Sequence, residues 1–314
     1  MVRYDRETAR RGKKYVQDRR DARRARSGGG RRGGGVAVGG GGALLIALLA
    51  AFCGVPALTG DGSGFGLDTQ TPFDGSAQGF DDVAGPATTT VDPDADTVEF
   101  MEFLMFDIQD TWDAYFEEAG QLYEPTTLVI FEDVVNTGCG QATSAVGPFY
   151  CPAPGDNMVY IDLGFYNELS RRFGAPGDFA QAYVIAHEVG HHIQSITGIS
   201  DAVRQAQAQD PGNRNEYSIR QELQADCLAG VWAFSANRRL TEVSGQPIIE
   251  PGDINEGLAA AAAVGDDRIQ SSAGARVNPE TWTHGSSEQR QRWFLTGFET
   301  GDPEQCDPFA VDNP

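Results

Sequence analysis

The feature that most restricts the fold of this chain is the sequence HEVGH at residues 187–191, which follows an apolar run. Histidines four residues apart lie on one face of a helix, so both imidazoles can bind one metal ion if the segment is helical. Residues 180–186 are mostly small or apolar. We therefore expect a buried helix that is capped by Asp178, covers 179–197 and stops at Gly198.

The motif has the chemistry of a zinc hydrolase. His187 and His191 can bind Zn²⁺ at about 2.0–2.1 Å, and Glu188 is rotated away from them around the helix. Glu188 can therefore reach a water on the metal and act as general acid and base. The alternative is a solvated His-Glu face on an ordinary helix, which the surrounding apolar residues disfavour.

A third ligand is expected from residues 220–230, RQELQADCLAG. Glu222 and Asp226 are four residues apart on one helical face, and a catalytic zinc keeps three protein ligands and one open position. We predict that Glu222 binds the metal and that Asp226 accepts the second ring N–H of a ligand histidine. The alternative is that both carboxylates lie on a wet surface. Rivals for the third ligand are His192, which lies about 100° around the helix from His191, and Glu216 and His284.

Charge divides the chain of 314 residues into two parts. Residues 1–35 hold 13 Lys and Arg against 4 Asp and Glu, whereas residues 36–314 hold 11 against 41. We expect residues 1–35 to be a disordered basic tail. The acidic remainder repels phosphates, so we expect no nucleic-acid partner.

Between these parts lies an uncharged stretch, residues 36–58, with a continuous apolar run at 43–53. We expect a transmembrane anchor, with a cleaved signal segment as the alternative; lipid attachment at Cys53 and a buried core helix are weaker readings. The preceding basic residues favour a cytoplasmic N-terminus, which gives a single-pass protein of the cell membrane with its body outside the cytoplasm. Cleavage would make it secreted. Residues 59–91 are rich in Gly, Asp, Thr and Pro and are expected to form a flexible linker.

Residues 92–314 are expected to form one α+β domain, mainly helical with a small sheet. Apolar spacing predicts strands at Thr126–Phe131 and Met158–Leu163. Besides the helix with the HEVGH motif, helices are predicted at 94–119, 216–239, from 252 through 263, and from 286 to 297 or 301.

Four cysteines of this domain allow three disulfide pairings. Cys139 and Cys151 flank a short Gly- and Pro-containing loop, so a local bridge is the natural choice. Cys227 and Cys306 would then join a central helix to the C-terminal segment. Zinc binding by these cysteines is disfavoured because no Cys-x-x-Cys spacing occurs.

Several motifs together resemble the putative neutral zinc metallopeptidase family of bacteria. They are AYVIAHEVGHHIQ at 182–194, RQELQADCLAGVWA at 220–233, THGSSEQRQRWF at 283–294, SAVGPFYCP at 144–152, VYIDLGFYNEL at 159–169 and RFGAPGDFAQAY at 172–183. The resemblance covers nearly the whole chain and implies a zincin-like fold and a zinc peptidase of the gluzincin type. It also implies His187, His191 and Glu222 as metal ligands and Glu188 as the catalytic acid and base.

Two further features bear on catalysis. Thr283-His284, with Arg290 following, is similar to a Ser-His-Pro…Arg pattern of heat-shock and CAAX-prenyl-type membrane zinc proteases, although no Pro follows His284. We expect His284 or Arg290 to stabilise the oxyanion; a structural role at the start of the next helix is the alternative. Zincin-type enzymes bind extended substrate along an edge strand, and Met158–Leu163 is the candidate, with a plain core strand as the alternative.

The sequence therefore predicts a membrane-anchored, exported zinc peptidase that acts on peptides or proteins, with Glu188 and His284 as catalytic residues. One alternative is a non-catalytic binding or scaffold protein that retains the zincin frame. The other is a zinc amidase that acts on non-peptide amides of the cell envelope.

Overall fold

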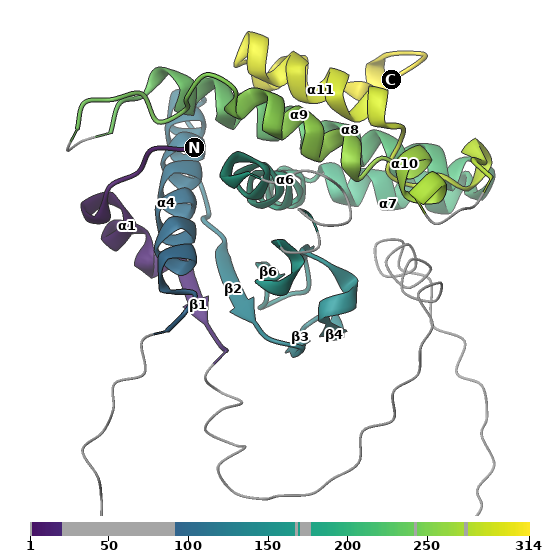
Figure 1. Cartoon of the computed structure of the whole chain (residues 1–314). Coiled ribbons are helices and arrows are strands. Elements are labelled where there is room, and N and C mark those ends of the chain that lie inside the picture. Colours follow the sequence, from purple (N-terminus) through teal and green to yellow (C-terminus); the bar gives the residue numbers. More distant parts are fainter. Residues whose placement is uncertain (1, 21–91, 167–168, 170–176, 242–243, 273–275) are drawn as a thin grey trace, which may run out of the picture.

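The computed structural model describes residues 2–20, 92–166, 169, 177–241, 244–272 and 276–314. A mainly helical body rests on one small sheet, as the α+β prediction requires (Figure 1). The expected anchor or signal segment at 36–58 and the linker at 59–91 lie outside the described residues. Within those residues, no helix combines the length and the apolar character needed to span a membrane.

The sheet has the strand order β1-β2-β6-β5. The strands are β1 (Val16–Asp18), β2 (Thr127–Phe131), β6 (Met158–Asp162) and β5 (Phe149–Cys151). β1, β2 and β6 run parallel, and β5 runs antiparallel to β6. A separate hairpin is formed by β3 (Val134–Thr137) and β4 (Gly140–Thr143). The two predicted strands are thus confirmed.

The expected role of Met158–Leu163 as an edge strand is wrong. β6 lies between β2 and β5, and β5 forms the edge on that side of the sheet. The cause is that β5 has only three residues, Phe149–Cys151, which is too short to give a strand pattern in the sequence. Its place in the sheet comes from pairing with β6, where Tyr150 is opposite Val159.

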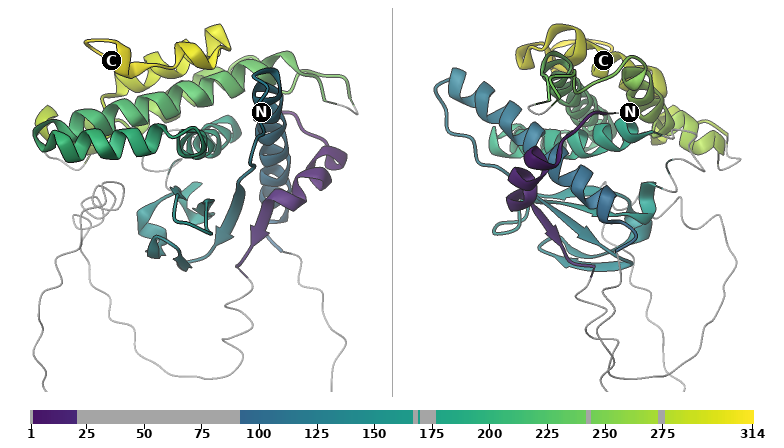
Figure 2. Two further views of the ribbon diagram at one scale, coloured as in Figure 1. Left: turned by 180° about the vertical axis from the view of Figure 1, so that it is seen from behind. Right: turned by 60° about the vertical axis from the view of Figure 1, so that its left-hand side comes forward.

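The helices lie mostly in a layer above the sheet, in which α6 is nearest the strands, whereas α4 runs from that layer down beside β1 (Figures 1 and 2). The helices are α4 (Ala95–Glu118), α6 (Asp178–Ile196), α7 (Ile199–Gln209), α8 (Arg214–Arg238), α9 (Asp253–Ala263), α10 (Asp266–Ser272) and α11 (Ser287–Thr300). All the predicted helices are present. α7 and α10 were not predicted. α11 begins with the capping box of Ser286 and Gln289 and ends at Gly301, which has φ 64°.

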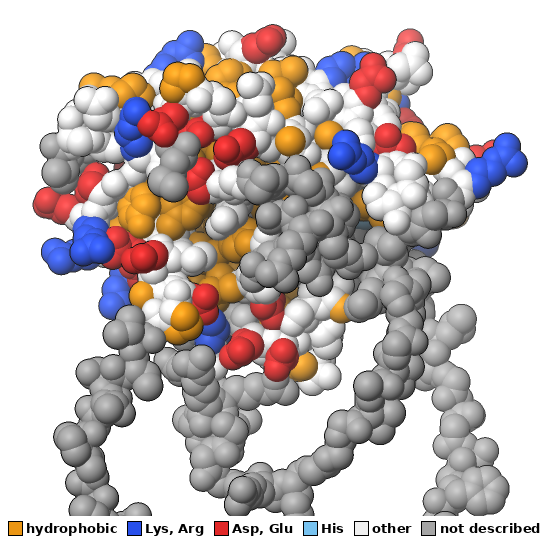
Figure 3. Space-filling model, viewed as in Figure 1, with side chains coloured by type: hydrophobic (Ala, Val, Ile, Leu, Met, Phe, Trp, Pro, Cys, Tyr) orange, Lys and Arg blue, Asp and Glu red, His pale blue; other side chains and the backbone are white. Residues whose placement is uncertain are grey.

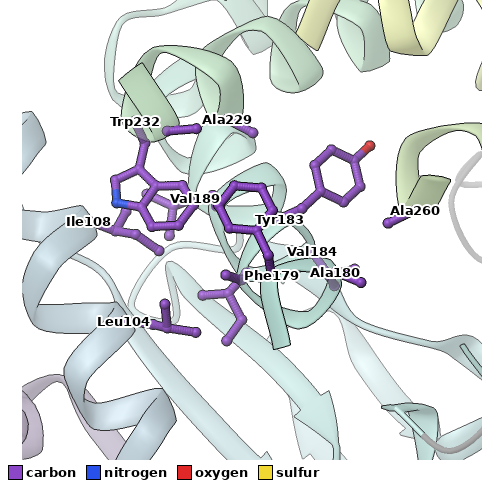
Figure 4. Close-up of a cluster of buried hydrophobic side chains, with 14 of the residues drawn as sticks. Leu104, Ile108, Phe179, Ala180, Tyr183, Val184, Val189, Ala229, Trp232 and Ala260 are labelled. Atoms are coloured by element: carbon purple, nitrogen blue, oxygen red, sulfur yellow. The ribbon is translucent and has the colours of Figure 1, made fainter. Parts of the chain in front are cut away.

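α6 is the core helix that the apolar run predicts (Figure 4). The Phe179 ring stacks on Trp232 of α8 with centroids 5.9 Å apart. Leu104 and Ile108 of α4 belong to the same buried cluster. Asp178 is the first residue of α6 and does not cap it; the N-cap is Gly177.

Glycines set two close helix crossings. A Cβ on Gly190 of α6 would lie 3.0 Å from the carbonyl oxygen of Ala225, so α8 approaches α6 at the motif. A Cβ on Gly230 would overlap the carbonyl of Phe294, so this residue admits α11. Small residues of α8 therefore allow the close approach of both α6 and α11.

Both disulfides follow the expected pairing. Cys139 is bonded to Cys151 and ties the hairpin to β5. Cys227 of α8 is bonded to Cys306 of the C-terminal segment.

The prediction of a disordered tail is wrong for residues 2–20. They form α1 (Arg6–Gly12) and β1, and a Cβ on Gly12 would overlap the carbonyl of Glu102, so α1 packs closely on α4. The physical reason is electrostatic as well as apolar: this basic segment lies on an acidic body. Arg20 bridges Asp92 and Asp94 at 2.7 and 2.9 Å, and blue and red side chains adjoin beside α1 in Figure 3.

Residues 2–20 complete the sheet of the body, since Gln17 pairs with Val129 in the parallel ladder.

We expect Gly12→Ala to destabilise the whole protein. Alanine is the better helix former by about 1 kcal/mol, but its Cβ would overlap the Glu102 carbonyl. The free energy of unfolding should fall by about 1–3 kcal/mol in urea titration. Arg10→Ala, at an exposed position of α1, should change it by less than about 0.5 kcal/mol. Equal stability of the two variants would mean that residues 2–20 do not pack on α4.

Candidate metal centre

The close approach of α6 and α8 brings together the three predicted ligand residues. Nε2 of His187 lies 3.2 Å from Oε2 of Glu222, and Nε2 of His191 lies 3.5 Å from Oε1 of the same carboxylate. The two imidazole rings are 4.8 Å apart, nearly perpendicular. His187, His191 and Glu222 thus form a group that could hold a metal ion.

The donor set fits zinc. Ligand atoms at about 2.0–2.1 Å from a tetrahedral ion are about 3.3 Å from one another, close to both distances to Glu222. Among the described residues, Nε2 of His191 is buried without a hydrogen-bond partner. A buried polar atom of this kind is costly unless something binds it, and a metal ion would.

The electrostatics of the group also favour a cation. Burial alone would raise the pKa of Glu222, but His191 and His187 hold it well below its usual range. Burial would lower the pKa of His187, yet Asp226 and Glu222 raise it to about 9. The Glu222 carboxylate, which faces both rings, would stabilise a dication in the same way as it stabilises positive charge on His187.

Asp226 lies where we expected it, against His187. Its Oδ1 accepts from Nδ1 of His187 at 2.9 Å, which leaves Nε2 of that ring directed at Glu222. Tyr183, one turn before His187, donates its hydroxyl to the same oxygen. Burial would raise the pKa of Asp226, but Arg290 and His187 lower it, so the group is a carboxylate.

Arg290 is the partner of Asp226 and not a free oxyanion donor. Its Nε and Nη2 donate to the two carboxylate oxygens at 2.7 and 2.8 Å, and Nη2 also reaches the Tyr183 hydroxyl. The residue is buried, with 3 % of its surface exposed. The role of His284 in oxyanion stabilisation stays a prediction.

His284 is oriented by a carboxylate that the sequence did not reveal. Oδ1 of Asp266 lies 3.1 Å from Nδ1 of His284, and Oδ2 accepts the backbone N–H groups of Thr283 and His284 at 2.7 Å each. The His284 ring is close enough to Glu222 for its charge to lower the pKa of that carboxyl. Asp266 is 18 residues away in sequence, with no spacing that would link it to the motif.

The other two rivals for the third ligand lie elsewhere. Both ring nitrogens of His192 are engaged, Nε2 with the carbonyl of Glu124 at 2.6 Å and Nδ1 with the Tyr150 hydroxyl at 3.2 Å. Glu216 pairs with Arg220 on the surface of α8 at 2.8 Å. His192 therefore faces away from the site, as its position on the helix predicts.

Gln194 is a site residue that the sequence reasoning missed. Its Oε1 lies 2.9 Å from Nδ1 of His191. Its position three residues after His191, one helical turn away, is the signal that could have found it.

Glu188 is buried beside the three ligand residues. One carboxylate oxygen, Oε2, has no hydrogen-bond partner within the described part of the chain. Burial raises the pKa of Glu188, and the imidazoles of His191 and His187 oppose that rise. A buried carboxylate with an unused oxygen and a raised pKa has the properties of a general base.

Comparison with known proteins agrees with this geometry. The family described as putative neutral zinc metallopeptidase matches residues 6–309. The chain belongs to this family. The match includes residues of α1 and β1, in line with their place in the folded body.

The chain is similar to the uncharacterized protein YpfJ of Escherichia coli strain K12. It is 46 % identical over 226 residues, which are 71 % of this chain and 76 % of YpfJ. The uncharacterized protein Rv2575 of Mycobacterium tuberculosis strain ATCC 25618 / H37Rv is 45 % identical over 221 residues, 69 % of this chain and 73 % of that protein. No solved structure matches the chain, so the zincin-like character of the fold stays a prediction.

We expect Asp226→Asn to destabilise the metal-free protein strongly. The substitution keeps the shape but leaves the buried guanidinium of Arg290 without its carboxylate. The loss should be about 3–5 kcal/mol in urea unfolding with a chelator present. Glu216→Gln, which breaks an ion pair on the surface of the same helix, should cost less than about 1 kcal/mol. Similar values for the two variants would contradict a structural role for the Asp226–Arg290 pair.

Proposed function

We propose that this protein is a zinc-dependent peptidase that hydrolyses peptide bonds. The observation that carries the proposal is the convergence of His187, His191 and Glu222 beside a buried carboxylate, Glu188, whose Oε2 makes no hydrogen bond among the described residues. A scaffold protein with no catalytic role would not require Glu188 there. Membership of the zinc metallopeptidase family supports the same reaction class.

His187, His191 and Glu222 would hold the zinc ion. When bound, zinc supplies a Lewis acid that lowers the pKa of water toward about 7. Glu188 takes the proton of the attacking water at Oε2 and later delivers it to the leaving amine. Its raised pKa, caused by burial, makes the protonated form accessible during that transfer.

His284 stabilises the negative charge that develops on the carbonyl oxygen of the substrate. Asp266 accepts from Nδ1 of the ring, so Nε2 can donate to the substrate oxygen only when the ring is an imidazolium, whose charge the Asp266 carboxylate would balance. Asp266 also holds the backbone of residues 283 and 284 through their N–H groups, which fixes the turn that carries the ring. A donor positioned in advance in this way stabilises the transition state without reorganisation.

The substrate would lie along β5. This strand is the edge of the sheet next to the helix with the motif, and in the described part of the chain no strand pairs with its outer side. Tyr150 of β5 contacts His192, the neighbour of His191 in sequence, which shows how near the strand is to the site. An extended peptide can add to such an edge through its backbone.

The two disulfides support an oxidising compartment for the folded protein. We therefore propose that the chain acts outside the cytoplasm. Since residues 2–20 are part of the folded body, they would be exported with it.

Glu188→Gln should abolish peptide hydrolysis and leave zinc binding intact. The amide cannot accept the proton of water, so kcat should fall by at least about 10²–10⁴. Metal analysis should still find one zinc per chain, and a chelator should inactivate the wild type reversibly. Glu216→Gln is the matched control, with unchanged kcat. If Glu188→Gln digests peptides as well as the wild type, the proposed mechanism is wrong.

His284→Ala should lower kcat by about 10²–10³, again with zinc retained. His284→Gln, which keeps an N–H donor, should lose less. The measurement is kcat on a peptide substrate together with zinc content. A loss of only a few-fold in His284→Ala would reject the role in oxyanion stabilisation and leave the ring a structural one.

A further inference from the structure

The two histidines of the site are held by different means. His187 contacts the Asp226 carboxylate, whereas His191 contacts the neutral amide of Gln194. Gln194 is fully buried, and its Nε2 donates to the carbonyl of Gln221 at 2.7 Å and to Oε1 of Gln224 at 3.0 Å. The Nε2 of Gln224 donates in turn to the carbonyl of Cys306 at 2.8 Å.

Which group donates in each hydrogen bond of this series follows from its last member, the carbonyl of Cys306. The carbonyl oxygen of Cys306 can only accept, so the NH₂ group of Gln224 must face it and the oxygen of Gln224 must face Gln194. The NH₂ group of Gln194 then faces Gln224, and its oxygen faces His191. Nδ1 of His191 must therefore carry the proton, and the lone pair is left on Nε2, which is the atom that faces Glu222.

We propose that this chain of hydrogen bonds, from Cys306 through Gln224 and Gln194, sets the tautomer of His191 and that the Cys227–Cys306 disulfide thereby supports zinc affinity. The proposal rests on the proposed function in one respect, that His191 is a zinc ligand. Gln194 and Gln224 are positioning residues in this scheme, since neither touches the metal or the substrate.

The disulfide is placed to hold the terminal acceptor. Cys306 follows a short 3-10 turn, Pro303–Gln305, and is not itself in a helix or strand. Its bond to Cys227 attaches it to α8, three residues after Gln224. Arg220 of the same helix binds the carbonyls of Pro308 and Val311, so the C-terminal segment is fastened along α8 on both sides of the contact.

The second disulfide is the natural control. Cys139–Cys151 joins the hairpin region to β5, and within the described residues neither cysteine is hydrogen-bonded to a ligand histidine. Loss of this disulfide also removes one covalent cross-link, but it leaves the hydrogen bonds from Cys306 to His191 unchanged.

The test measures zinc affinity of the full chain by competition with a fluorescent chelator. Four variants are compared with the wild type: Gln194→Leu, Gln224→Leu, Cys227→Ala/Cys306→Ala and Cys139→Ala/Cys151→Ala. Loss of support for a metal-bound histidine weakens metal affinity by about 10–100-fold, which we expect for Gln194→Leu. Gln224→Leu and Cys227→Ala/Cys306→Ala should weaken it by about tenfold. The Cys139→Ala/Cys151→Ala control should stay within about twofold, and near-ultraviolet circular dichroism should show that each variant is folded.

Folded Cys227→Ala/Cys306→Ala that binds zinc as tightly as the control would overturn the proposal. If that variant fails to fold, Gln224→Leu decides by the same criterion. Failure of the proposed function looks different: the wild type itself would then bind no zinc, or His191→Ala would leave its affinity unchanged.

Discussion

The carboxylate of Asp226 is completely buried, and the arrangement of three helices depends on how its charge is compensated. An isolated buried carboxylate would cost several kcal/mol, so α11 supplies Arg290 and α6 supplies His187 and Tyr183. The same contacts direct Nε2 of His187 toward Glu222. The stability of the helical layer and the geometry of the metal centre therefore both depend on the Asp226 carboxylate. A substitution of this residue should affect both.

The groups that hold the two imidazoles differ in charge, but neither adds much net charge to the metal site. The charge of Asp226 is balanced by Arg290, so the neighbour of His187 adds little net charge. The neutral amide of Gln194 adds none at His191. Glu222 is the one carboxylate among the three ligand residues, so a dication bound there would keep a net positive charge. That charge is what acidifies water in a hydrolytic zinc site.

The N-terminal segment and the acidic body are electrostatically complementary. Most of the basic residues precede residue 36, and most of the acidic ones follow it. The structure uses this asymmetry: Arg20 is held by Asp92 and Asp94, and β1 extends the sheet beside β2. Charge separation along a sequence is thus compatible with docking as well as with a solvated tail, and only the partner surface distinguishes the two outcomes.

The sequence by itself determined whatever depends on local spacing. The turn between His187 and His191, the face shared by Glu222 and Asp226, the long helices and the two central strands all follow from periodicities within a single element. Local proximity gave the Cys139–Cys151 pair, and elimination gave the other. Tertiary structure alone decided the place of β5 at the sheet edge, the docking of residues 2–20, and the partners Asp266 for His284 and Cys306 for Gln224. Each of these joins elements far apart in the chain, and such contacts arise from packing and charge compensation, which leave no periodic trace in the residues that make them.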